Sequence, residues 1–159
     1  MGLGLTGLGF WLLRYDMAKR SIRLQGLSRF MGLALYIGYG WLITAGLLMI
    51  WTGAVTGGYW YDAILHSIFL GCVFSMIFGH APVIFPVVLK LPVAFRPSFY
   101  FHLGLLHLSL LLRIAGDISQ IDPLRKWGSL LNAVAILLFL YNTVTSIVDT
   151  RLAETSHSG

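Results

Sequence analysis

The sequence carries few charged residues. Only 11% of its 159 residues are Asp, Glu, Lys or Arg, whereas soluble domains carry about 25%. The mean hydropathy is +0.81, and several apolar runs exceed the roughly 18 residues that indicate a transmembrane helix. These properties exclude an ordinary soluble domain. We therefore predict an all-α integral membrane protein.

Cysteine and the common catalytic motifs are also scarce. A single cysteine, Cys72, excludes a disulfide framework within the chain. The sequence contains no phosphate-binding loop and no nucleophile–base motif. Its basic residues flank apolar runs and form no separate domain, so no nucleic acid partner is expected. A soluble-type enzyme is therefore not expected, and catalysis by this chain alone stays an open question.

Four apolar runs are predicted to cross the membrane. They cover about residues 30–51, 59–89, 98–115 and 127–148, and short loops join them. Pro82 and Pro86 interrupt the second run, which predicts a kinked second helix. A straight helix over residues 59–90 would be about 48 Å long, which exceeds a bilayer core of about 30 Å. Residues 30–148 are thus expected to form a four-helix bundle.

The two ends of the chain differ from this apolar centre. Residues 2–13 are apolar but too few to span a bilayer. We predict an N-terminal interfacial or tucked-in segment over residues 1–29, with Trp11 and Tyr15 near the lipid headgroups. Its basic stretch, residues 14–29, is expected either to set the topology or to contact anionic lipid. Residues 149–159 are polar and are predicted to be a flexible tail.

The distribution of Lys and Arg predicts an orientation. Eight lie on one predicted side of the membrane and three on the other, and the 52–58 loop has none. Basic residues favour the cytoplasmic side. We therefore predict that both termini lie in the cytoplasm. The eight are Arg14, Lys19, Arg20, Arg23, Arg29, Lys90, Arg96 and Arg151, and the three are Arg113, Arg125 and Lys126.

Four of the five histidines lie inside predicted spans. An ionisable side chain rarely sits in hydrocarbon without a partner, and neutral imidazole is a common ligand of metals and haem iron. His66 and His80 are 14 residues apart, so a regular helix places them within about 40° of one face and about 21 Å apart. Two tetrapyrroles stacked across a bilayer need such a spacing. The alternative is that each histidine only donates a hydrogen bond to a carbonyl or hydroxyl group.

His80 and His107 are predicted to face each other. The turn between the second and third spans centres near residues 93 and 94, and each histidine lies 13 or 14 residues from it. Equal distances from a turn indicate similar depths on antiparallel helices. The pair therefore predicts a bis-histidine haem site or a two-ligand metal site. His102 points about 140° away from His107, so the two are not expected to ligate one centre.

His66 is predicted to lie near the other membrane surface. Asp62, Arg113 and Asp117 are its expected neighbours at that depth. Arg113 and Asp117 are one helical turn apart and are expected to form an ion pair. Arg113 could instead bind a haem propionate, which makes it a candidate cofactor-binding residue.

Two sulfur-containing residues leave copper as an alternative cofactor. Cys72 and Met76 are one turn apart between His66 and His80, and soft sulfur ligands with imidazole suit copper. However, Cys72 and His80 differ by about 80° around a regular helix. Core packing is the alternative explanation of both sulfurs.

One motif of the second span reads His66-Ser-Ile-Phe-Leu-Gly71, continues as Phe78-Gly79-His80-Ala-Pro82 and reaches Pro86. This motif resembles a helix of bacterial polytopic membrane proteins related to haem-copper oxidases, such as the NnrS-like nitric-oxide-response haem and copper proteins. The resemblance implies haem b ligation by His66 or His80 and a location in the inner membrane of a bacterium. Such proteins have many more spans, so this chain would be a small relative or one subunit of a complex.

These observations predict an integral membrane subunit that binds a tetrapyrrole, haem b, and supports electron transfer in a larger complex. Copper and (bacterio)chlorophyll are the alternative cofactors. The expected partners are the lipid bilayer and other membrane subunits. Two alternative functions stay open. One is a cofactor-free accessory subunit of a respiratory or photosynthetic complex, and the other is a small proton-coupled transporter with a broken second helix.

Overall fold

The computed structural model describes residues 1–90 and 93–157, and no strand occurs within these two ranges. Four helical stretches are long and apolar enough to cross a membrane: Leu27–Thr52, Tyr59–Val88, Phe99–Ser119 and Asp122–Arg151. The predicted all-α fold with four spans is therefore confirmed. The elements are α1 (Gly2–Tyr15), α2 (Ala18–Ser21), α3 (Leu27–Thr52), α4 (Tyr59–His66), the π-helix η1 (Ser67–Val73), α5 (Phe74–Leu89), α6 (Phe99–Ser119) and α7 (Asp122–His157).

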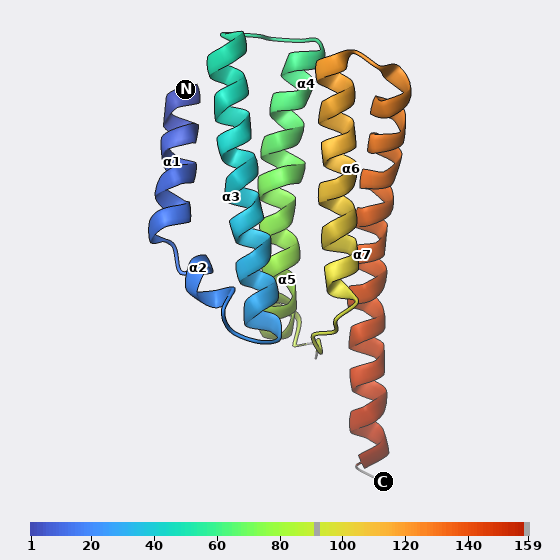
Figure 1. Cartoon of the computed structure of the whole chain (residues 1–159). Coiled ribbons are helices and arrows are strands. Elements are labelled where there is room, and N and C mark those ends of the chain that lie inside the picture. Colours follow the sequence, from blue (N-terminus) through green and yellow to red (C-terminus); the bar gives the residue numbers. More distant parts are fainter. Residues whose placement is uncertain (91–92, 158–159) are drawn as a thin grey trace.

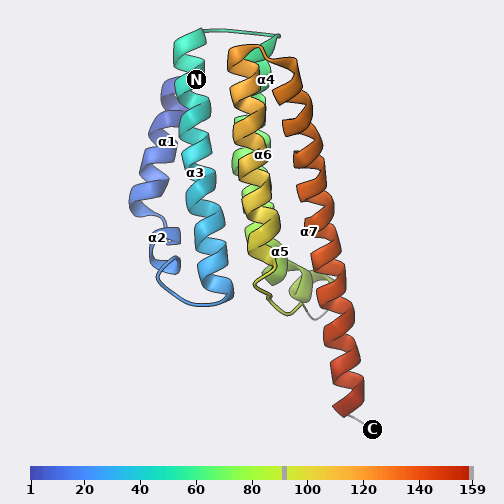
Figure 2. The same cartoon turned by 45° about the vertical axis from the view of Figure 1, so that its right-hand side comes forward.

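The long helices lie side by side and alternate in direction (Figure 1). In chain order they are α3, then α4 with η1 and α5, then α6 and α7. The rotated view brings α6 in front of α5 (Figure 2). The contacts of α1 are mainly with α3, and those of α7 are mainly with α6. Hence α1 and α7 form the two outer edges of the helical assembly.

Two clusters of buried side chains hold the helices together. One cluster is aromatic and joins Phe30 of α3, Phe78 of α5, Phe99 of α6 and Phe139 of α7. The rings of Phe78 and Phe139 are stacked with their centroids 4.3 Å apart. The other cluster is centred on Trp41 of α3 and is closer to the 52–58 loop. Every spanning helix therefore contributes to a common core.

Glycine allows the closest approach of neighbouring helices. A Cβ added at Gly128 of α7 would lie 2.6 Å from the backbone nitrogen of Arg113 in α6. A Cβ at Gly71 of η1 would overlap the Trp41 side chain of α3. Small residues at such points let helix backbones pack without intervening side chains. These two contacts fix α7 on α6 and η1 on α3.

The second span is a continuous helix with an unexpected π-helical segment. Pro82 and Pro86 lie inside α5 and do not end it, and the last part of α5 turns out of line with α4 (Figure 2). The hydroxyl groups of Ser67 and Ser75 donate to the carbonyls four residues earlier, at 2.8 and 2.6 Å. A π-helix has a wider turn than an α-helix. A rotation of 100° per residue therefore does not hold over the whole stretch from His66 to His80. The predicted angle of about 40° between these two residues does not apply to this helix.

The N-terminal segment packs lengthwise against α3. A Cβ at Gly9 would lie 3.2 Å from the carbonyl oxygen of Tyr39, and a Cβ at Gly2 would lie 2.8 Å from that of Gly46. Of the two predicted arrangements, interfacial or tucked-in, the structure has the tucked-in one. This packing carries Met1 to the end of the assembly that holds Gly53.

Met1 and the end of α7 therefore lie at opposite ends of the helical assembly (Figure 1). The distribution of Lys and Arg predicted both termini in the cytoplasm, and the side of a membrane that each end faces stays a prediction. In the structure α1 and residues 16–26 together extend along α3, which places the first residue away from the basic stretch, residues 14–29.

At the other terminus, α7 continues to His157, beyond the predicted end of the fourth span at residue 148. The guanidinium of Arg96 binds the carboxylate of Asp149 at 2.8 Å and ties this helix to the connection between α5 and α6. The predicted flexible tail is therefore helical up to residue 157, and its last two residues lie outside the described ranges. The same holds for Leu91 and Pro92 of the predicted turn.

Candidate functional site

His107 of α6 is hydrogen-bonded within the core. The indole Nε1–H of Trp41 donates to Nδ1 of His107 at 3.0 Å. Because an indole nitrogen only donates, Nδ1 is the acceptor, and Nε2 carries the proton of a neutral imidazole. That nitrogen faces the hydroxyl oxygen of Ser75 at 3.5 Å. Neither nitrogen of His107 therefore offers a free lone pair to a metal or haem iron.

His80 is not brought together with His107. Its Nδ1 lies 2.8 Å from the carbonyl oxygen of Met76 on its own helix, so Nδ1–H is the donor and Nε2 keeps its lone pair. His107 of α6 instead faces Ser75 of α5. Ser75 precedes His80 by five residues, which is about 7.5 Å along that helix. Residues 93–98 between α5 and α6 are not helical, and non-helical chain advances further per residue than a helix. Equal counts from the turn therefore do not give equal depths.

His102 is the most enclosed of the four histidines. Its side chain is fully buried, and its Nδ1 lies 3.1 Å from the side-chain nitrogen of Asn142. The rings of Phe78, Phe99 and Phe139 surround it at centroid distances of 5.0 to 5.4 Å. Its Nε2 has no hydrogen-bond partner. These rings occupy the space that a tetrapyrrole would need, so His102 does not fit an axial ligand.

His66 of α4 is partly exposed and borders an apolar groove. Its Nδ1 lies 2.7 Å from the carbonyl oxygen of Asp62, so this nitrogen carries the proton and Nε2 keeps its lone pair. The groove has a volume of about 290 Å³, and Leu65, Phe69 and Leu70 line the rest of it. A side chain on the outer face can reach a group that is not part of this chain.

The four histidines thus divide into two kinds. His102 and His107 accept hydrogen bonds from other helices in the interior, whereas His66 and His80 bond to their own helix and stay partly exposed. A histidine that ligates a metal commonly donates its other N–H to a carbonyl, and His66 and His80 have this arrangement. Within residues 1–90 and 93–157, no three metal-ligating side chains form a group. Any metal bound by these two histidines would need ligands from outside the chain.

Arg113 belongs to an ion-pair cluster near the 52–58 loop. Its Nε lies 3.4 Å from Asp117 Oδ2, which confirms the predicted pair, although the two atoms lack hydrogen-bond geometry. Its Nη2 lies 3.6 Å from the carboxylate of Asp62. Arg125 of α7 binds Asp117 at 2.6 Å and Asp62 at 2.9 Å. The cluster joins α4, α6 and α7. Because Arg113 lies beside two carboxylates within the chain, its charge is balanced without a haem propionate.

Arg125 also stacks on an aromatic ring. Its guanidinium carbon lies 4.4 Å from the ring centroid of Tyr59 at the start of α4. This cation–π contact adds to the ion pairs and fixes the side chain between two helices. From the sequence, Arg125 was expected only to be a topology determinant.

The two sulfur-containing residues between His66 and His80 differ in exposure. Cys72 is buried at 6% exposure, whereas Met76 is 37% exposed. Cys72 packs in the interior, as the core-packing alternative expected, and Met76 does not. A copper site at these residues stays a prediction.

Two kinds of residue were missed by sequence reasoning. Trp41 lies in the middle of a span, where tryptophan is unusual because it favours the interfaces. Asn132 and Asn142 are polar residues in the fourth span, and the amide oxygen of Asn132 accepts from the Ser109 hydroxyl at 2.6 Å. Intramembrane polar residues generally have partners, so each of these positions signalled a contact between helices.

Comparison with known proteins places the whole helical assembly in one family. No curated protein matches the chain, and no solved structure matches it. A family model described as "Domain of unknown function (DUF8744)" matches residues 1–148, which include α1 and all four spans up to residue 148. On the strength of this match over most of its length, the chain belongs to the DUF8744 family.

Proposed function

We propose that this protein is a membrane subunit that binds a tetrapyrrole, haem b, on the outer face of its second span and supports electron transfer in a larger complex. His66 would be the in-chain axial ligand, and His80 is the second candidate. The proposal rests on one observation. The Nδ1–H groups of both histidines bond to carbonyls of their own helix, at 2.7 and 2.8 Å, which leaves each Nε2 free to ligate.

The surroundings of His66 support this assignment. A carbonyl acceptor at Nδ1 fixes the tautomer and raises the basicity of Nε2. Leu65, Phe69 and Leu70 give the groove an apolar surface that suits one face of a macrocycle. Haem b supplies a one-electron carrier when bound. The residues of this chain would orient the macrocycle and keep water away from one side of it.

The groove is open, so the proposal includes a second chain. A volume of about 290 Å³ lies at the lower limit of ordinary ligand sites, which occupy about 300–1,000 Å³. The other axial ligand and the cover over the macrocycle would come from a neighbouring subunit or from a second copy. Phe69, which lines this groove, is 54% exposed and would form part of that contact.

The test is an absorption spectrum with metal analysis of protein purified in mild detergent. Haem b gives a Soret band and iron, (bacterio)chlorophyll gives red absorbance, and copper appears in the metal analysis alone. The proposal expects a Soret band that is lost in His66→Ala or His80→Ala and is retained in His107→Ala. Protein that lacks both a Soret band and iron after isolation with its partners would refute it.

A cofactor-free accessory subunit is the second candidate, and a separate observation favours it. Each intramembrane histidine has a hydrogen-bond partner within the chain. The burial of His66, His80 and His107 is therefore explained without a cofactor, whereas Nε2 of His102 has no hydrogen-bond partner. This candidate expects colourless protein that co-purifies with other membrane subunits in stoichiometric amounts.

A proton-coupled transporter has weaker support. A relay needs polar groups that follow one another across the membrane. The polar side chains buried between the helices instead form small separate groups, such as Ser109 with Asn132, His102 with Asn142, and His107 with Trp41 and Ser75. We therefore favour the first two candidates.

A further inference from the structure

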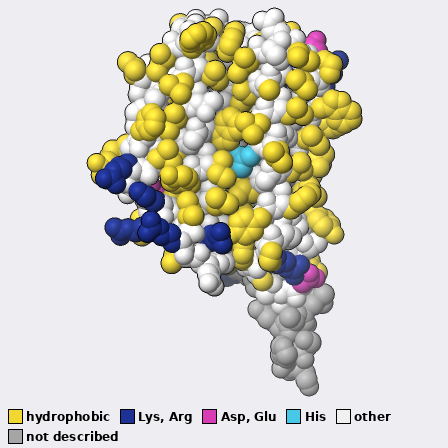
Figure 3. Space-filling model, viewed as in Figure 1, with side chains coloured by type: hydrophobic (Ala, Val, Ile, Leu, Met, Phe, Trp, Pro, Cys, Tyr) yellow, Lys and Arg dark blue, Asp and Glu magenta, His cyan; other side chains and the backbone are white. Residues whose placement is uncertain are grey.

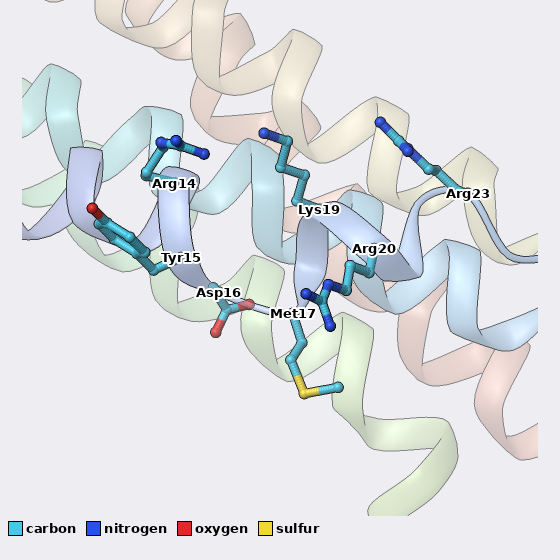
Figure 4. Close-up of a pocket in the computed structure, with 7 residues that line it drawn as sticks. All are labelled: Arg14, Tyr15, Asp16, Met17, Lys19, Arg20 and Arg23. Atoms are coloured by element: carbon cyan, nitrogen blue, oxygen red, sulfur yellow. The ribbon is translucent and has the colours of Figure 1, made fainter.

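A strongly basic hairpin lies where α1 turns back toward α3. Arg14, Lys19, Arg20 and Arg23 fall within ten residues, and all four side chains are exposed. They line a hollow of about 490 Å³ at the end of α1 and along α2. Arg14, Lys19 and Arg23 extend toward the same side of the hairpin, and Asp16 lies on the other side (Figure 4). We call this group of four cations the basic hairpin site.

One carboxylate, that of Asp16, lines the same hollow as the four cations, so the site keeps an excess of positive charge. Asp16 accepts the backbone N–H of Ala18 at 2.7 Å and so acts as a local cap. In the described part of the chain, none of the four cations forms an ion pair. Arg14 lies 5.7 Å from the ring centroid of Tyr15. Four like charges held together without partners favour an anionic ligand.

Close backbone packing keeps the hairpin in place. A Cβ at Gly32 of α3 would lie 2.9 Å from the carbonyl oxygen of Ala18 and 2.7 Å from the backbone nitrogen of Ile22. Gly9 makes a similar close approach between α1 and α3. The cations therefore project from a segment that is fixed to a spanning helix. Such a site is formed before its ligand arrives, which reduces the ordering cost of binding.

An apolar surface adjoins the charged one. Phe10, Trp11 and Met17 are 57 to 72% exposed on the same hairpin. Hydrophobic side chains lie directly above the basic side chains on this flank of the molecule (Figure 3). A ligand that fits both surfaces has an anionic head and hydrocarbon chains. A free inorganic anion would use only the charged part.

We propose that the basic hairpin site binds one anionic phospholipid, with its phosphate among the four cations and its acyl chains along α1. The lipid would fill the hollow and cover the apolar outer face of α1. This inference is independent of the proposed cofactor, because the site is built from α1 and α2 and not from the second span.

The test is native mass spectrometry of detergent-solubilised protein with added lipid. The wild type is expected to retain phosphatidylglycerol or cardiolipin and to lose phosphatidylcholine. The variant Lys19→Gln/Arg23→Gln should bind the anionic lipid about thirtyfold more weakly, because each basic residue near the headgroup contributes about one kcal/mol. The control Lys126→Gln/Arg151→Gln removes the same charge from exposed positions elsewhere and should change binding less than threefold.

Three results would overturn the inference. Equal retention of phosphatidylcholine would show that headgroup charge is not recognised. Equal losses in the two double variants would show that only net charge matters. Displacement of the lipid by inorganic phosphate alone would assign the hollow to a free anion. Glutamine keeps most of the apolar stem of the replaced side chain, so each variant is expected to fold. Gel filtration of each variant checks this.

Discussion

The buried carboxylate of Asp117 gives the sharpest stability prediction. Its side chain is 0% exposed, and its two oxygens lie 2.6 Å from Arg125 Nε and 3.4 Å from Arg113 Nε. Asp117→Asn keeps the shape of the side chain and removes its charge. The substitution leaves the guanidinium groups of Arg113 and Arg125 facing a neutral amide, close to the turn between α6 and α7.

The magnitude follows from the burial of the partners. Removing one partner of a fully buried ion pair costs about 3–5 kcal/mol. The Arg113 and Arg125 side chains are 14% and 23% exposed, and Arg125 keeps the Asp62 carboxylate at 2.9 Å. We therefore expect Asp117→Asn to lower the free energy of unfolding by about 2–3 kcal/mol.

Asp122→Asn is the matched control. Its carboxylate also pairs with Arg125, at 3.3 Å, but is 61% exposed. An exposed pair contributes about 0–1 kcal/mol. The assay is reversible unfolding in mixed micelles of increasing SDS fraction, followed by circular dichroism. If the two variants differ by less than about 0.5 kcal/mol, the buried cluster does not stabilise the helices as argued.

Three further predictions concern the packing of the helices. Gly128→Ala should lower the free energy of unfolding by about 1–3 kcal/mol, because its Cβ would meet the Arg113 backbone. Gly104→Ala, where a Cβ meets nothing within 4 Å, should be neutral or stabilising in the same assay. Trp41→Phe should cost about 1–3 kcal/mol because it leaves His107 Nδ1 without its donor, and an unchanged unfolding curve would contradict that hydrogen bond. Epitope tags at the two ends of the chain should be accessible from opposite sides of sealed vesicles, and accessibility from one side would contradict the position of α1.

The four spans were predictable because hydropathy and length alone decide them. The course of α1 was not, since a short apolar segment can lie at an interface or against another helix. Its position depends on glycine-to-backbone contacts between Gly9 and α3, and these require both partners to be known. The π-helix over Ser67–Val73 likewise has no periodic signature in the sequence.

The histidines show the same limit at the level of side chains. Their presence in the membrane pointed correctly to partners, but not to which partners. Counting residues from the turn predicted that His80 faces His107. In the structure, His107 accepts a hydrogen bond from Trp41, and His80 donates one to a carbonyl of its own helix. A local contact such as that of His80 with Met76 can be anticipated from a spacing of four residues. A contact between helices depends on their register, which a count of residues from the turn does not give.

We propose that His66 and His80 can ligate a cofactor, whereas His102 and His107 stabilise the helical assembly. The tetrapyrrole and iron content per polypeptide should be measured in four single His→Ala variants, each isolated with its partners. We expect the His66 or the His80 variant to lose the cofactor. The His102 and His107 variants should retain it and be less stable instead. Loss of the cofactor only in the His102 or His107 variant, with full retention in the other two, would refute this division of roles.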